Sequence, residues 1–139
     1  MELRDASLKM GSRFLKTILG LDIPYESDFL QNYLTVTGNK KIHHACLYGA
    51  FCDSVCIPLA DALSHYLYAQ TSAIVTTCVK SIPLSQTDGQ IILTSSFLLL
   101  SEMLQEVTRL DTCMYGASSP AFDIRSMQHE ALYSRIYMS

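Results

Sequence analysis

Apolar side chains recur with the spacing of an α-helix along most of this 139-residue chain. Leu3, Phe14 and Ile18 fall on one helical face, and the sequence predicts a helix over 3–19. Gly20 stands where that helix would end, because glycine is common just past helix C-termini. The first part of the chain is therefore predicted to be an amphipathic helix followed by a break.

Two shorter helices are predicted next. Ser27 is placed to cap the second helix, whose Leu30 and Leu34 would face inward. A third helix is predicted over 43–56. Gly49 lies among alanines in this segment, so we expect a thin helix that a neighbour can approach closely.

The longest predicted helix covers 59–80. Its polar residues fall on one stripe and the remaining positions are apolar, so we expect a central helix that is buried over most of its circumference. Ser85 and Asp88 then have the order of a capping box, in which each side chain bonds the backbone amide of the other. We expect the helix that they begin to continue to about Leu110.

The segment 120–139 is rich in apolar and aromatic residues for a chain terminus, which is usually frayed. We predict a short helix that starts near Pro120 and an extended tail from Leu132 onward. The segment is too apolar to remain in water and too polar to form a core alone, so we expect it to dock on another surface. Arg135 lies between tyrosines, a composition typical of interface hot spots.

These elements predict an all-α protein, a bundle of about six helices with a short C-terminal helix and an extended tail. The expected organisation is a bundle over 1–119 and a docking segment over 120–139, and the length suits one domain. Only 17% of the residues are charged, against about 25% in an average domain. Much of the surface is therefore expected to be covered by a dimer mate or a partner protein.

Charge and cysteine usage exclude several classes of function. The net charge is −3 and the chain has no basic stripe, which argues against nucleic-acid binding. The five cysteines are odd in number, so we expect reduced thiols and a cytoplasmic location. No uncharged apolar run is long enough to span a membrane.

A metal site is the main alternative that the residues suggest. His43, His44 and Cys46 offer donors that suit nickel, copper or zinc. Adjacent helical positions point about 100° apart, however, so the two imidazoles do not easily share one ion. Cys52 and Cys56 are one helical turn apart and are interpreted as core cysteines. We therefore predict no metal site, and a nickel-binding or metal-storage protein is the alternative function.

No set of catalytic residues stands out. His65 and Cys78 lie thirteen residues apart on one predicted helix, which separates them by about 20 Å and excludes direct contact. No paired carboxylates or triad order appear elsewhere. The sequence is therefore predicted not to encode an enzyme.

Three blocks resemble the UreF-type urease accessory proteins. The ending 129–139 is similar to the C-terminus of that family, and Pro-Leu-x-Gln-x-Asp-Gly-Gln at 83–90 is similar to a second family block. A weaker block covers 1–14. The resemblance runs over nearly all of the chain and is greatest to the Helicobacter-like branch. Two motifs of the family's N-terminal half are absent, so the resemblance implies the C-terminal portion of such a protein.

This resemblance implies a non-catalytic cytoplasmic scaffold that serves in the maturation of urease. Such proteins form homodimers, bind a UreD/UreH-type accessory protein, and recruit the UreG-type GTPase for nickel insertion into apo-urease. Nickel belongs to this pathway, and no tightly bound cofactor is implied. The arginine matching Arg135 helps to hold the tail in the GTPase-recruiting shape. The predicted partner-binding residues are Ile124, Met127, His129, Tyr133, Arg135 and Tyr137.

Overall fold

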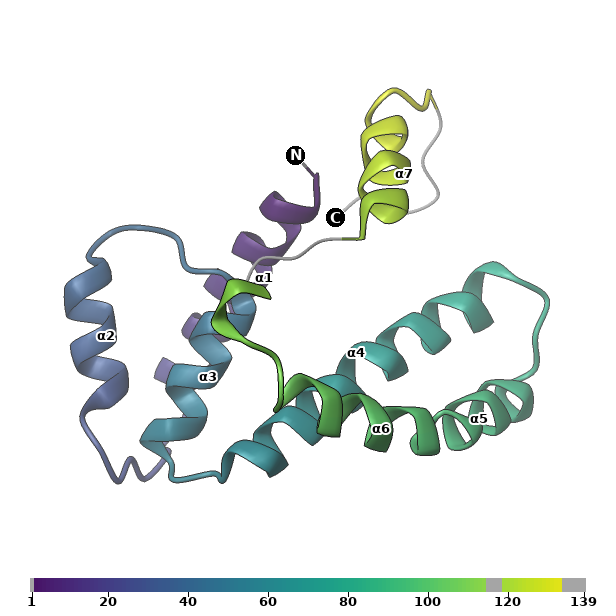
Figure 1. Ribbon diagram of the computed structural model, residues 1–139. Coiled ribbons are helices and arrows are strands. Elements are labelled where there is room, and N and C mark those ends of the chain that lie inside the picture. Colours follow the sequence, from purple (N-terminus) through teal and green to yellow (C-terminus); the bar gives the residue numbers. More distant parts are fainter. Residues whose placement is uncertain (1, 115–118, 134–139) are drawn as a thin grey trace. The chain divides into compact units, whose positions relative to one another are not determined.

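The computed structural model describes residues 2–114 and 119–133. This part of the chain holds seven α-helices, one 3-10 turn and no strand, which confirms the expected all-α class (Figure 1). The helix number exceeds the predicted six because the segment after Ser85 forms two helices. The bounds are α1 Glu2–Leu19, α2 Phe29–Thr37, α3 His44–Ser54, α4 Leu59–Ser81, α5 Gln86–Ser95, α6 Phe97–Val107, η1 Thr112–Met114 and α7 Pro120–Glu130.

The chain divides into two compact units. Unit 1 comprises Met1–Ile57 and Gly116–Ser139, and unit 2 comprises Pro58–Tyr115. Helix α7 belongs to unit 1, where it contacts α1. The predicted division into a bundle over 1–119 and a docking segment over 120–139 stays a prediction.

Unit 1 has a core that is built from α1, α2 and α3 (Figure 1). Leu47 of α3 is fully buried, and Ile18 of α1 and Leu30 of α2 pack around it. Phe14 and Phe51 extend the cluster with an edge-to-face contact at 5.5 Å between ring centroids, a favoured arrangement for aromatic pairs. The inward faces that the periodicity predicts thus meet at one point.

A buried serine connects the start of α2 to the end of α3. The Ser54 hydroxyl accepts a hydrogen bond from the Leu30 amide at 2.8 Å and donates one to the Ala50 carbonyl at 3.0 Å. The N-cap residue of α2 is Asp28, which makes no side-chain cap bond. The predicted cap, Ser27, lies one residue earlier, and its hydroxyl accepts a hydrogen bond from the Phe29 amide at 3.3 Å. A second amide at this helix end is satisfied from a residue 24 positions away.

Close approach in unit 1 depends on Gly11 rather than on Gly49. A Cβ atom at Gly11 would overlap the carbonyl oxygen of Ile42, whereas nothing lies within 4 Å of a Cβ at Gly49. The expectation of a close neighbour at Gly49 is therefore wrong. The helix that is approached is α1, and the approaching segment is the loop before α3.

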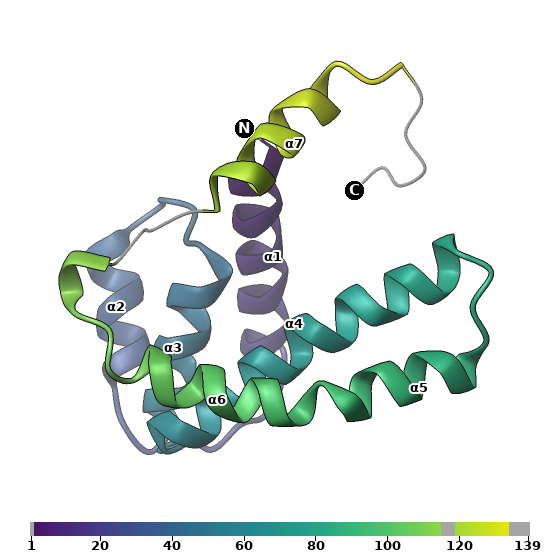
Figure 2. The same ribbon diagram turned by 45° about the vertical axis from the view of Figure 1, so that its right-hand side comes forward.

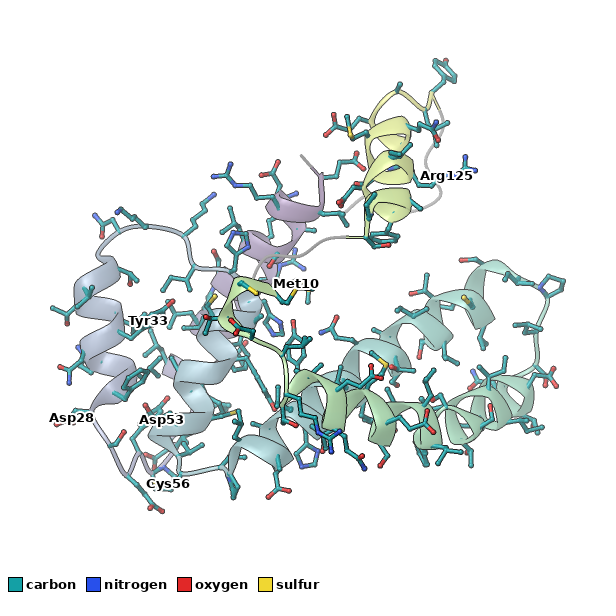
Figure 3. All side chains as sticks on the ribbon, in the orientation of Figure 1. Met10, Asp28, Tyr33, Asp53, Cys56 and Arg125 are labelled. Carbon is teal, nitrogen blue, oxygen red and sulfur yellow. The ribbon has the colours of Figure 1, made fainter. Side chains whose placement is uncertain are left out.

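Helix α3 ends in a Schellman motif that has a cysteine at the position usually held by glycine. The Ile57 amide donates to the Cys52 carbonyl at 2.9 Å and the Cys56 amide to the Asp53 carbonyl at 3.0 Å. Cys56 has a φ of 55°, a left-handed conformation that costs a residue with a Cβ atom free energy. Figure 3 shows Asp53 and Cys56 together at this end of α3. Cys52 is buried as predicted, but Cys56 is exposed, so its interpretation as a core cysteine is wrong.

Unit 2 is a hairpin in which α4 runs beside α5 and α6 (Figures 1 and 2). Helix α4 is the longest, as predicted, with 23 residues. Ala62 is its only buried residue, and Leu59 and Ile74 are largely exposed. The expectation that α4 is buried over most of its circumference is therefore wrong, because α5 and α6 cover one side of it.

Helix α5 begins with the predicted capping box. The Ser85 hydroxyl accepts a hydrogen bond from the Asp88 amide at 3.0 Å, and the Asp88 carboxylate accepts one from the Ser85 amide at 2.9 Å. The helix ends at Ser95, and α6 starts after Ser96. Both serine hydroxyls donate to carbonyls three residues back, at 2.8 and 2.7 Å, and such bonds compete with the helical pattern. The single helix predicted to about Leu110 is therefore divided.

Candidate partner-binding surface

Helix α7 turns its polar side toward its own unit. Asp123, Ser126 and His129 follow at intervals of three residues, and all three are half-buried. Figure 2 shows α7 beside the first turns of α1. The Nδ1 atom of His129 lies 2.7 Å from the Glu2 carboxylate oxygen of α1, so this pair anchors α7.

The apolar side chains of α7 point away from that contact. Ile124 is 55% exposed and Met127 is 67% exposed, although both would be expected to seek cover. Phe122 in the first turn and Leu132 after the helix are also largely exposed. Arg125 projects outward and donates a hydrogen bond to the Gln128 side-chain oxygen at 3.1 Å (Figure 3). We call Phe122, Ile124, Met127, Leu132 and Tyr133 the α7 apolar face.

The predicted partner-binding residues fall into three groups. Ile124, Met127 and Tyr133 are exposed on the α7 apolar face. His129 contacts Glu2 and is the member that holds the helix to α1. Arg135 and Tyr137, with the other residues of the expected tail beyond Tyr133, lie outside the described residues.

Two contributors to this surface were missed by the sequence reasoning. Glu2 is the carboxylate that meets His129 across 127 positions of sequence, and nothing in the local pattern of either residue indicates the pair. Phe122 belongs to the apolar content of 120–139, but its exposure was not predicted. A helical projection of 120–130 would have shown that Asp123, Ser126 and His129 share one side of α7, but not that this side faces the protein.

The metal-donor candidates at the start of α3 do not converge on one point. The Nδ1 atom of His43 lies 3.1 Å from the Ser7 hydroxyl oxygen of α1, whereas the His44 ring packs edge-to-face on Phe14 at 5.4 Å between centroids. Burial lowers the pKa of His44 below its ordinary value of 6.5. Cys46 is exposed. Within residues 2–114 and 119–133, no three His, Cys, Asp or Glu side chains are grouped so as to hold an ion.

The thiol of Cys56, which follows α3, is held in its protonated form by its surroundings. A hydrogen bond to the Glu26 carboxylate raises the pKa of the Cys56 thiol, with burial and the charges of Glu26 and Asp53 as further causes. Burial raises the pKa of Tyr48 to about 12, aided by a hydrogen bond with Cys52 and the charge of that thiol. A protonated thiol is a weak nucleophile and a weak metal ligand, so Cys56 is not prepared for reaction.

No helix within the described ranges combines the length and the apolar character that crossing a membrane requires.

Comparisons with known proteins agree with the family resemblance of the three sequence blocks. The profile of the UreF family matches residues 1–96. The chain is 34% identical over 140 residues to the urease accessory protein UreF of Paenarthrobacter aurescens, an alignment that covers 99% of this chain and 61% of the relative. It is 36% identical over 144 residues to UreF of Haemophilus influenzae, covering 99% of this chain and 58% of the relative. The chain thus spans about three fifths of the length of these curated relatives.

Proposed function

This chain belongs to the UreF family of urease accessory proteins, and on that premise we propose that it serves as a cytoplasmic scaffold in the maturation of urease. In this proposal it binds a UreD/UreH-type accessory protein and, through that complex, recruits the UreG-type GTPase for nickel insertion into apo-urease. Nickel is the cargo of the assembly and not a cofactor of this chain. UreF accessory proteins are non-catalytic, which agrees with a sequence that predicts no catalytic set.

The observation that carries this proposal is the polarity of α7. A terminal helix normally buries its apolar side on its own protein and exposes its polar side. Here Asp123, Ser126 and His129 are half-buried while Ile124 and Met127 are exposed. The helix is thus held in place by polar contacts and offers apolar side chains outward, which is the arrangement that a partner's apolar groove requires.

The test is a pull-down of the UreD/UreH-type protein with variants of one exposed position. We expect Met127→Glu to reduce recovery of the complex about tenfold or more, because a charge is desolvated at the interface. Met127→Leu keeps the apolar character and is expected to retain binding. Equal recovery with both variants would contradict the proposal for α7.

The tail is tested separately. We expect Arg135→Ala, or deletion after Leu132, to leave the helices folded and to weaken assembly of the complex with the GTPase. Circular dichroism measures the first property, and co-purification of the UreG-type protein measures the second. Full GTPase recovery with either change would exclude a role of the tail, whatever the result for Met127.

We further propose that the chain forms a homodimer. The support is the exposed apolar surface of unit 2, where Ile91, Phe97 and Leu98 are uncovered and α6 buries no residue. Exposed patches of this kind mark protein contacts. Light scattering is expected to give a dimer mass for the chain and a monomer for Leu98→Glu, and an unchanged mass would count against this surface.

The alternative of a nickel-binding or metal-storage protein has less support. Its donors, His43, His44 and Cys46, are not grouped so as to hold an ion within the part of the chain that the structure describes. Equilibrium dialysis against nickel separates the two functions, since stoichiometric tight binding by this chain alone would favour storage.

A further inference from the structure

A groove of about 620 Å³ opens on unit 1, and no residue of α7 lines it. It runs between the second half of α1 and the loop that joins α2 to α3. Its floor is apolar and includes Leu15, Leu34 and Leu47. The volume lies in the range of about 300 to 1,000 Å³ that is typical of pockets that hold ligands.

Backbone features keep this groove open. Gly11 allows the Ile42 carbonyl to lie against α1, which fixes the end of the loop to the helix. Gly38 turns the chain out of α2 with a φ of 57°, a conformation that glycine adopts without steric cost. The loop therefore stands beside α1 with a gap between them, and no side chain of the described residues fills that gap.

The rim of the groove is basic although the chain is acidic. Lys16 of α1 and Lys40 and Lys41 of the loop line it, and they are three of the five lysines in a chain of net charge −3. Within residues 2–114 and 119–133, no carboxylate forms an ion pair with any of the three. Positive charge is thus concentrated around an apolar floor.

We propose that this groove binds an acidic amphipathic helix of a partner protein. An apolar floor with a basic rim matches a helix that has leucine-like residues on one face and glutamates beside them. The floor argues against a small inorganic anion, which would need polar partners. Rim charges of this kind raise the rate of encounter and reject partners of the wrong charge.

The proposal is tested with a defined peptide and does not depend on the role of α7. The probe is a fluorescent 18-residue helical peptide with leucines at i, i+3, i+4 and i+7 and glutamates elsewhere on its polar face. The control is a peptide of the same sequence with lysine in place of each glutamate. Because the chain is net negative, non-specific attraction would favour the lysine peptide. We expect the opposite in fluorescence anisotropy, with glutamate-peptide binding that weakens as sodium chloride is added.

Paired charge reversals locate the site. Lys40→Glu with Lys41→Glu is expected to weaken binding of the glutamate peptide about tenfold. Lys80→Glu with Arg109→Glu changes the net charge equally but lies in unit 2, and this control is expected to bind within about twofold of the unchanged chain. All four residues are exposed, so both variants are expected to fold, which circular dichroism checks.

Three results would overturn the inference. These are equal binding of the lysine peptide, equal weakening by both double variants, and affinity for the glutamate peptide that salt does not change. Met127→Glu is expected to leave peptide binding intact. Its effect on recovery of the UreD/UreH-type protein is measured apart, so failure at one surface is distinguishable from failure at the other.

Discussion

The two units hide their apolar residues to different degrees. In unit 1, α1, α2 and α3 each contribute a buried residue to the cluster around Leu47. In unit 2, α4 and α5 bury little more than Ala62 and Leu93, and α6 buries nothing. The apolar content of unit 2 is no lower, since α6 alone contains Phe97, Leu98 and three further leucines.

The difference lies in the arrangement and not in the composition. Three helices that converge on one point cover one another's apolar sides, whereas a hairpin of helices covers each member on one side only. Because apolar surface gains free energy when it leaves water, unit 1 is expected to supply most of the stability of the isolated chain. Unit 2 is expected to gain more when another surface covers it.

The largest expected effect comes from the centre of the unit 1 core. Leu47→Ala removes a fully buried side chain and should lower the free energy of unfolding by about 3 kcal/mol. Leu98→Ala is the same substitution in unit 2, at a position that is 73% exposed. It should alter the free energy of unfolding by less than about 0.5 kcal/mol. Urea titration followed by circular dichroism measures both. Similar losses would contradict the contrast between the units.

A glycine pair gives the next largest effect. Gly11→Ala places a methyl group against the Ile42 carbonyl and should cost about 2 kcal/mol, as overpacking does. Gly49→Ala meets nothing within 4 Å and should stabilise α3 by about 0.5 to 1 kcal/mol, because alanine favours a helix over glycine. The same urea titrations are expected to show a lower free energy of unfolding for Gly11→Ala and a higher one for Gly49→Ala. A loss at Gly49 would show a neighbour that the structure lacks.

The start of α5 should respond to Ser85→Ala and to pH. Loss of the cap should cost about 1 kcal/mol and speed amide exchange over 86–95 while α3 is unaffected. Hydrogen bonds from the Ser85 side chain and amide lower the pKa of Asp88 below its ordinary value of 3.8. Its stabilising contribution is therefore complete well above pH 3.8 and is lost as the pH falls through the lower pKa of the folded state. Exchange over 86–95 in Asp88→Asn should lack this pH dependence, and retention of it would exclude Asp88 as the titrating group.

The smallest expected effect is a gain of stability at the end of α3. Cys56→Gly removes a Cβ atom from a left-handed residue and should raise the free energy of unfolding by about 0.5 kcal/mol after the entropy cost of glycine. Cys56→Ala loses the same hydrogen bond to Glu26 but keeps the unfavourable conformation. It should not stabilise the chain, and equal behaviour of the two variants would dismiss the backbone explanation.

Local features of the fold could be predicted from the sequence. The bounds of α1 and the capping box at Ser85 and Asp88 depend on residues within a turn or two, and both appear where expected. The start of α7 at Pro120 is likewise set by proline at the first helical position. The division at Ser96 was missed, because two serine side chains compete there with the helix.

Features that join distant residues could not be predicted. The hydrogen bond from the Leu30 amide to Ser54 joins residues 24 positions apart. The contact between His129 and Glu2 joins residues 127 positions apart. The periodicity of α4 showed which face is apolar but not how much of it a neighbour covers. For the candidate surface, composition identified the segment 120–139, and the side of α7 that faces outward required the structure.

The central claim is that the α7 apolar face is where the accessory partner docks. Hydrogen exchange of the backbone amides, measured with and without the UreD/UreH-type protein, tests it directly. The account predicts slower exchange over 120–133 in the complex and unchanged exchange around Leu47 in α3. Equal exchange over 120–133 in the two states, with the complex demonstrably formed, would contradict the account.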